Sequence, residues 1–132
     1  MTYQEIKTEH SNKYNELMEK AGVFWAFSNK QFEEGLKKAN LKEGEKLVRI
    51  PGGGYCPKKN IDTLLKEIEI AGAINKKALK ALKEERTTAI LYELKNYECF
   101  YTGNIDDVVD MFKGIYTTAQ ILTVYKNNLN NQ

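Results

Sequence analysis

The chain has 132 residues, of which 42% are hydrophobic and 29% charged, and this composition is typical of a single globular domain with its own core. Lys and Arg together number 20 and Asp and Glu 18, so the net charge gives no general attraction to nucleic acid or to an anionic membrane. One His and two Cys cannot supply the closely spaced ligand pairs of a zinc site, and we expect no metal and no cofactor.

No apolar run approaches the roughly 20 residues that cross a bilayer, and the first ten residues, MTYQEIKTEH, lack the apolar core of a secretory signal. We therefore expect a cytoplasmic protein with no membrane partner. Cys56 and Cys99 are expected to be free thiols, because a reducing compartment disfavours disulfides. A catalytic cysteine with His10 as its base is an alternative, although no local signature supports it.

The first predicted helix covers residues 2–21, where apolar side chains recur every three or four residues before Gly22. It leads to residues 23–36, VFWAFSNKQFEEGL, which predict a strand running directly into a helix over 29–39. Both faces of an extended segment 23–27 would be apolar, so we expect a strand buried on both sides.

Two local motifs predict the start of that second helix. Ser28 and Gln31 have the spacing of a capping box, and Phe27 and Phe32 occupy the two positions of a hydrophobic staple. We expect Trp25 to lie in the core, with an exposed anchor for a partner as the alternative.

A polar turn at 41–46 precedes a second predicted strand at 47–50, which Pro51 ends. The glycine cluster that follows predicts either a turn or a partner-contacting loop, made of Gly52, Gly53, Gly54 and Tyr55. A phosphate cradle is disfavoured because the G-x-x-x-x-G-K-[ST] spacing is absent.

Asn60 is the predicted N-cap of the longest helix, in which Gly72 predicts a bend or a break. The end of this helix holds the most basic stretch of the chain: Lys76, Lys77, Lys80, Lys83 and Arg86. A solvated helix face is the favoured interpretation, because aromatic residues that would stack on bases are absent from this stretch. Nucleic-acid binding is the alternative.

The last third of the chain predicts a helix from residue 87, a third strand at 98–102, a short helix ending at Gly114, and a final helix capped by Thr117 and Gln120. Residues 127–132 are expected to fray. The region 93–110 is acidic, through Glu93, Glu98, Asp106, Asp107 and Asp110, and could contact a basic protein surface. The predicted fold is therefore α+β: one domain, 1–132, with five to six helices packed on a small three-stranded sheet.

Three stretches, FWAFSNKQFEEGLKK, RIPGGGY and YELKNYECFYTGNIDD, resemble the landmarks of a family of small uncharacterised proteins carried by bacteriophages, mobile elements and bacterial genomes. Those landmarks are F-x-A-F-S-N-x-Q-F-x-E-G, a glycine cluster after a short strand, Y-E-L and Y-T-G-[DN]. The resemblance spans nearly the whole chain. It implies an origin in a bacteriophage, mobile element or bacterial genome, but no activity, because no function is assigned to that family.

With that setting, the sequence predicts a non-enzymatic binding protein of phage or mobile-element origin whose partner is a host or phage protein. Inhibition of a host defence nuclease, such as a CRISPR effector, is the most concrete form of this hypothesis. The predicted contact residues are Tyr101, Asp106, Asp107 and Asp110, with Gly52 to Tyr55. The alternatives are a nucleic-acid accessory factor that uses the basic residues 76–86, and a small enzyme with a reactive cysteine.

Overall fold

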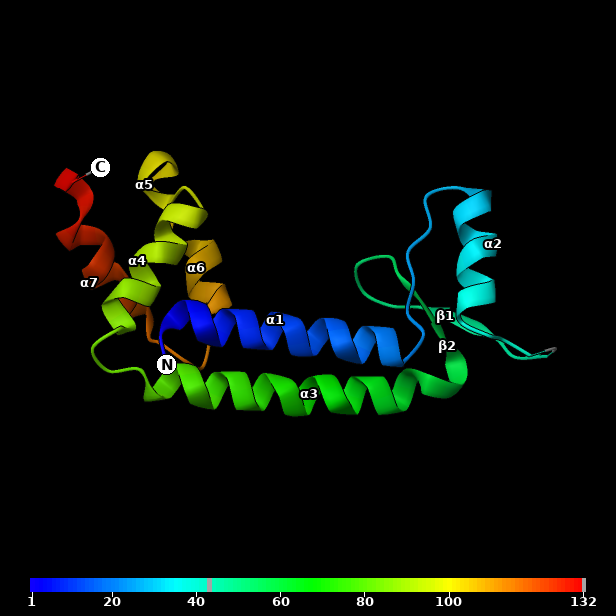
Figure 1. The fold of residues 1–132 in the computed structure, drawn as a ribbon. Coiled ribbons are helices and arrows are strands. Elements are labelled where there is room, and N and C mark those ends of the chain that lie inside the picture. Colours follow the sequence, from blue (N-terminus) through cyan, green and yellow to red (C-terminus); the bar gives the residue numbers. More distant parts are fainter. Residues whose placement is uncertain (43, 132) are drawn as a thin grey trace. The chain divides into compact units, whose positions relative to one another are not determined.

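A computed structural model describes residues 1–42 and 44–131 of the protein (Figure 1). Over these residues the chain forms seven α-helices, one short 3-10 helix and one antiparallel sheet of two strands. The chain divides into two compact units. The sheet unit is Thr8–Ala73, and the helical unit is Met1–Lys7 together with Ile74–Gln132. The α+β class is confirmed in this coarse form, and the single domain stays a prediction.

The sheet unit contains most of α1 (Tyr3–Lys20), then α2 (Asn29–Lys38), β1 (Leu47–Arg49), β2 (Tyr55–Pro57) and the first part of α3 (Lys58–Ala81). Its core joins the end of α1 to the hairpin and to α3, through Leu17, Met18, Ala21, Ile50, Cys56, Leu64 and Ala71. A side-chain amide completes the contact, since Asn60 Nδ2 donates to the Ala21 carbonyl over 2.8 Å. Asn60 is therefore not the N-cap of α3, which begins two residues earlier.

The predicted strand at 23–27 is reduced to a single bridge. The N–H groups of Phe24 and Tyr55 each donate to the other's carbonyl, over 3.0 and 2.8 Å. The chain bends at Phe27 and Ser28 as it enters α2, and only Phe24 pairs with the edge of the hairpin. Burial on both faces is also wrong, because Trp25 is 46% exposed and Phe27 is 90% exposed.

The start of α2 confirms the predicted cap but not the staple. Ser28 Oγ accepts from the Gln31 N–H over 3.2 Å, whereas the Gln31 side chain accepts from the Phe27 N–H instead of that of Ser28. Phe27 points to solvent and cannot pack on Phe32. Phe24 packs there in its place, with its ring centroid 6.0 Å from that of Phe32, because the Phe24 bridge already holds this ring beside the helix.

Two glycines allow the close packing of this corner. A Cβ on Gly35 would lie 2.1 Å from the Phe24 ring, and a Cβ on Gly54 would lie 2.9 Å from the Trp25 indole. The hairpin turn between β1 and β2 closes with the Ile50 N–H donating to the Gly54 carbonyl over 2.9 Å. Gly52 and Gly53 have φ of 96° and 88° in that turn, a region that side chains disfavour.

The helical unit is built from the end of α3, α4 (Arg86–Asn96), α5 (Cys99–Thr102), α6 (Asp106–Met111), α7 (Thr118–Asn127) and a 3-10 helix, η1 (Leu129–Asn131). Its core contains Ile90, Leu94, Val108, Phe112 and Ile121, each with no exposed surface. The predicted capping box of the last helix is confirmed, because Thr117 and Gln120 exchange both hydrogen bonds.

The predicted third strand at 98–102 is wrong, because this segment forms α5. Glu98 has φ +56° and reverses the chain directly after α4, and its carbonyl then accepts from the N–H groups of Tyr101 and Thr102. The Gly103 N–H donates to the Cys99 carbonyl. These local bonds occupy backbone groups that a sheet would require. The predicted break in α3 is also absent, since the helix continues through Gly72.

Two predictions fall partly on residues outside those described. The turn at 41–46 includes Glu43, and the tail at 127–132 includes Gln132. In the described part of the chain, no helix combines the length and the apolar character needed to cross a membrane.

Candidate functional site

The two groups of predicted partner-binding residues fall in different units. Gly52, Gly53 and Gly54 form the hairpin turn of the sheet unit, and Tyr55 begins β2 beside them. Tyr101 lies on α5 and the three aspartates on α6, in the helical unit. Each group is therefore a separate candidate site.

Residues 97–110 of the helical unit form what we call the acidic segment, because this stretch contains four carboxylates and neither Lys nor Arg. Tyr101 is 91% exposed and Tyr97 is 42% exposed. All the carboxylates of the segment are exposed as well, at Glu98, Asp106, Asp107 and Asp110. Glu93, which the sequence analysis assigned to this acidic surface, is fully buried and does not contribute to it.

Glu93 belongs to a buried polar cluster that the sequence analysis missed. The Tyr3 hydroxyl donates to Glu93 Oε2, Lys7 Nζ lies 2.8 Å from the same oxygen, and Asn96 Nδ2 donates to Oε1 over 3.1 Å. Burial, followed by the bond to Glu93, raises the pKa of Tyr3 far above its ordinary value. Both carboxylate oxygens are engaged by the protein itself, so the cluster stabilises the helical unit and offers no free group for chemistry.

The predicted basic residues are all exposed: Lys76, Lys77 and Lys80 on α3, Lys83 in the connection that follows, and Arg86 at the start of α4. Within residues 1–42 and 44–131 none of the five forms an ion pair. The Lys76 side chain lies over Gly114, with Nζ 2.7 Å from the place of a Cβ on that glycine. These residues therefore form a solvated basic surface without an aromatic side chain in their stretch.

The thiols are not arranged as nucleophiles. Cys56 has no exposed surface and Cys99 is 1% exposed. Burial raises the pKa of both thiols, and the nearby Asp107 carboxylate raises that of Cys99 further. Raised values disfavour the reactive thiolate, which argues against the enzyme alternative. The described residues contain no group of three or more His, Cys, Asp or Glu that could hold a metal ion.

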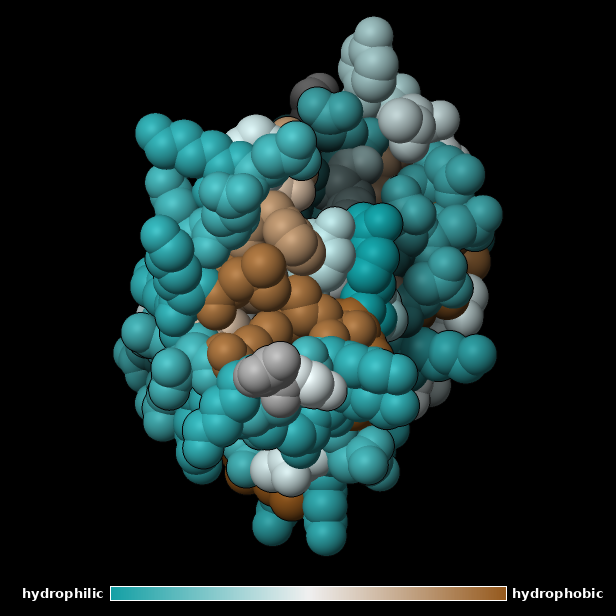
Figure 2. All heavy atoms as spheres, turned by 90° about the vertical axis from the view of Figure 1, so that its right-hand side faces the viewer, coloured by the Kyte–Doolittle hydropathy of each residue, from teal (hydrophilic) through white to brown (hydrophobic). Residues whose placement is uncertain are grey.

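A hollow with both apolar and polar lining residues marks the sheet unit. Figure 2, viewed from the side where Figure 1 draws α2, shows apolar residues gathered in a recess that hydrophilic residues surround. A pocket in this unit has a volume of about 410 Å³, and its lining includes Asn15, Met18, Val23, Phe24, Trp25 and Lys38. Pockets of this size bind small molecules or single side chains of a partner.

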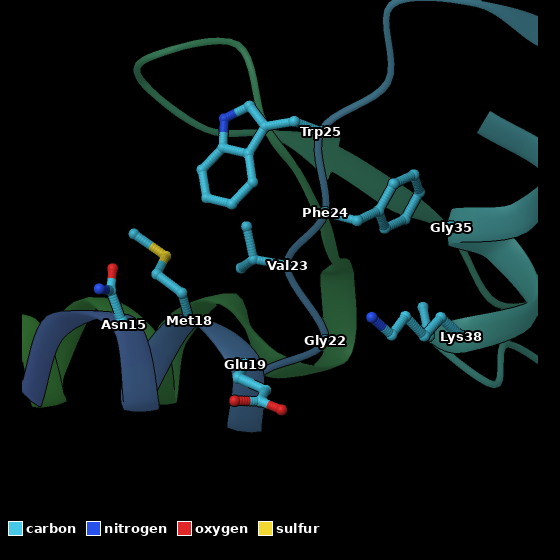
Figure 3. Close-up of a pocket in the computed structure, with 10 residues that line it drawn as sticks. Asn15, Met18, Glu19, Gly22, Val23, Phe24, Trp25, Gly35 and Lys38 are labelled. Carbon is cyan, nitrogen blue, oxygen red and sulfur yellow. The ribbon is translucent and has the colours of Figure 1, made fainter. Parts of the chain in front are cut away.

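The extended segment after α1 arranges the walls of this pocket. Trp25 and Val23 point to one side of the segment, above Met18 and Asn15 of α1, while Phe24 points the other way, onto Gly35 (Figure 3). This alternation is the ordinary consequence of an extended backbone. The Lys38 amine points toward the segment from α2, and the Glu19 carboxylate points away from Trp25.

An arginine extends the aromatic surface on the hairpin. The Arg49 guanidinium lies 5.3 Å from the centroid of the Tyr55 ring, and the Tyr55 ring stacks on Phe24 at 5.5 Å. One guanidinium nitrogen would lie 3.6 Å from a Cβ on Gly53, the neighbour of the glycine under Trp25. At this end of the hairpin, Trp25 therefore lies next to the glycine turn, and the glycine turn lies next to Arg49.

Comparison with known proteins gives a family and no function. No curated protein and no solved structure matches the chain. One family profile, described as a family of unknown function (DUF7659), matches residues 2–130, which includes all the α-helices and both strands described above. The chain therefore belongs to the DUF7659 family of unknown function.

Proposed function

We propose that this protein is a non-enzymatic binding protein, and that it acts by protein–protein contact through the acidic segment, residues 97–110. The observation that carries the proposal is Tyr101, which is 91% exposed among exposed carboxylates that no basic residue of the segment neutralises. Tyrosine is enriched among the side chains that dominate binding energy at interfaces. The surrounding carboxylates favour a partner with a basic surface, which they would also attract over a distance.

The finer proposal is that the partner is a host defence nuclease, such as a CRISPR effector, which the protein inhibits for a phage or mobile element. The resemblance of the landmark stretches supports the setting, and the acidic segment supports the mechanism. A surface that holds guide or target nucleic acid is basic, so a protein carrying Tyr101, Asp106, Asp107 and Asp110 could occupy it in place of the phosphates.

Affinity purification of the tagged full chain from bacteria that express such effectors, followed by mass spectrometry, tests the proposal. The paired measurement is the efficiency of phage plating with and without expression of the chain. We expect one protein partner at a fixed ratio, and an increase in plating where the effector targets the phage. Recovery of no protein partner together with unchanged plating would overturn the proposal.

Matched variants make that experiment specific. Tyr101→Ala combined with Asp107→Asn removes the exposed ring and one charge, and we expect at least tenfold weaker retention of the partner. Tyr14→Ala combined with Asp62→Asn is the control, because Tyr14 is 37% exposed and Asp62 is an exposed carboxylate in the first turns of α3. Equal loss in both double variants would show that the acidic segment is not the contact surface.

Nucleic-acid binding through the basic residues between 76 and 86 is a second candidate, because all five are exposed and lack ion pairs within the described residues. It requires binding to DNA or RNA that weakens steeply with salt, since neutralised phosphates release counterions. Replacement of Lys76, Lys80 and Lys83 by Gln should then reduce both the affinity and the salt dependence.

A further inference from the structure

Two exposed aromatic side chains on the sheet unit are not explained by the fold. Phe27 is 90% exposed, and the helix start beside it is completed by Ser28 and Gln31 without its ring. Trp25 covers Gly54 with one part of its indole and leaves 46% of its surface exposed. Since a large exposed apolar side chain contributes nothing to the core, a surface that carries two of them within three residues is a candidate for binding.

The stretch of sequence that carries these rings has an excess of basic residues. Residues 21–60, which include the pocket segment, α2 and the hairpin, contain eight Lys and Arg but only four acidic residues, whereas the whole chain is nearly balanced. One of the four carboxylates, Glu45, pairs with Lys59 at 2.8 Å. Lys38 points at the pocket segment, while the Glu19 carboxylate points away from Trp25. The surface is therefore suited to an anionic ligand.

The aromatic spacing fits bases rather than an acidic peptide. Trp25 and Phe27 are only two residues apart and both are exposed, so neighbouring bases of one strand could reach both rings. Stacking on such rings is tolerant of sequence because every base has a π-face, and an acidic peptide offers no comparable partner. The adjoining turn has no side chains at Gly52 and Gly53, so a backbone could approach it closely.

We infer that the sheet unit binds single-stranded nucleic acid, with bases stacked on Trp25 and Phe27 and phosphates contacted by Lys38 and Arg49. A duplex would bind more weakly, because its bases are already stacked on one another and closed to the rings. The inference is independent of the proposed function, which depends on the helical unit.

Trp25 is the single tryptophan of the chain, so fluorescence excited at a wavelength that the eight tyrosines do not absorb reports on this site alone. The full chain is titrated at low salt with a 12-nucleotide oligothymidylate, with the same sequence as a duplex, and with polyglutamate as a polyanion without bases. We expect saturable quenching by the single strand, with affinity that falls as salt is added, and at least tenfold weaker binding of the duplex. Equal binding of polyglutamate, or no quenching at low salt, would overturn the inference.

Variants are compared by the fluorescence anisotropy of a labelled oligonucleotide. Phe27→Ala should weaken binding about tenfold without affecting folding, because the ring is exposed and stacking accounts for a large part of such affinities. Lys38→Gln should weaken binding and lower the salt slope by about 0.7, the value for one phosphate contact on a single strand.

Two control variants distinguish the alternatives. Tyr101→Ala removes a ring of equal exposure from the helical unit and should leave oligonucleotide binding unchanged. Replacement of Lys76, Lys80 and Lys83 by Gln should also leave it unchanged. If the lysine variant loses binding while Phe27→Ala keeps it, the nucleic acid lies on α3 and the inference is wrong. Loss of partner capture in Tyr101→Ala alone bears only on the proposed function.

Discussion

Glu93 is buried because three partners compensate for the removal of its charge from water. Lys7 supplies the opposite charge, while Tyr3 and Asn96 supply hydrogen bonds, and the Lys7 amine also lies 5.0 Å from the centroid of the Tyr92 ring. Tyr3 and Lys7 both come from the first seven residues, which explains why this segment belongs to the helical unit. The sequence spacing could have indicated that Glu93 is buried, because Glu93 follows Ile90 by three residues and falls on the same helical face.

Removal of the Glu93 carboxylate should destabilise the protein strongly. Glu93→Ala leaves the Tyr3 hydroxyl without its acceptor and the half-buried Lys7 amine without its partner, and we expect a loss of about 3 kcal/mol in the free energy of unfolding. Urea denaturation followed by circular dichroism measures the loss. Glu98→Gln, a change at an exposed carboxylate nearby, should remain within about 0.5 kcal/mol of the wild type. Equal effects would show that Glu93 contributes no more than a surface charge.

The raised pKa of Tyr3 predicts that the folded protein loses stability at alkaline pH. Its pKa is raised in the folded state by burial and by the bond to Glu93, so its contribution is fully present below pH 10 and is lost as the pH rises above that value. The loss is up to about 1.4 kcal/mol per pH unit. Tyr3→Phe cannot ionise, so its urea midpoint should fall less than that of the wild type between pH 9 and pH 11. A parallel fall in both proteins would assign the effect to the other titrating groups.

At the scale of single elements, local chemistry predicted the helix starts, and partners distant in sequence decided the strands. Ser28 with Gln31, and Thr117 with Gln120, form caps from side chains within four residues, so a short window of sequence contains the whole interaction. A strand instead requires a neighbour from elsewhere in the chain. Segment 98–102 has a strand-like composition, but the Glu98 carbonyl accepts locally from the N–H groups of Tyr101 and Thr102, and residues 99–102 form α5.

Gly35 on α2 and Gly72 on α3 show the same contrast between local helix propensity and contacts with distant residues. Gly35→Ala should destabilise the protein despite the better helix propensity of Ala, because its Cβ would lie 2.1 Å from the Phe24 ring; we expect a loss of about 1–3 kcal/mol. Gly72→Ala on α3 should stabilise by about 1 kcal/mol, because no atom outside the local helix lies within 4 Å of its added Cβ. Thermal melts of the two variants should move in opposite directions. A stabilised Gly35→Ala would contradict the packing of Phe24 on α2.

At the scale of the whole molecule, the chain has two hydrophobic cores, one in each compact unit. A single core is the simplest expectation for a domain of this length, and composition carries no information on how buried residues are shared between cores. The two cores raise the question of whether the units unfold together.

The single-domain prediction requires one cooperative unfolding transition. Leu94 has no exposed surface in the core of the helical unit, so Leu94→Ala should cost about 2–5 kcal/mol there. Trp25 fluorescence reports on the sheet unit, and far-ultraviolet circular dichroism reports on all helices. If the chain is one domain, Leu94→Ala lowers both midpoints equally. An unchanged Trp25 transition beside a lowered helical one would show that the units are separate domains.

The sequence by itself determined the approximate positions of most helices and the caps at Ser28 and Thr117, because these depend on residue types at short spacing. Tertiary structure alone decided that Phe24 packs on α2 while Trp25 and Phe27 face solvent, and that Glu93 is buried beside Tyr3 and Lys7. Both results depend on contacts between segments far apart in the chain, whose free energy no local pattern contains. For that reason the sequence predicted most helices but not the strands at 23–27 and 98–102, nor the exposure of Trp25, Phe27 and Glu93.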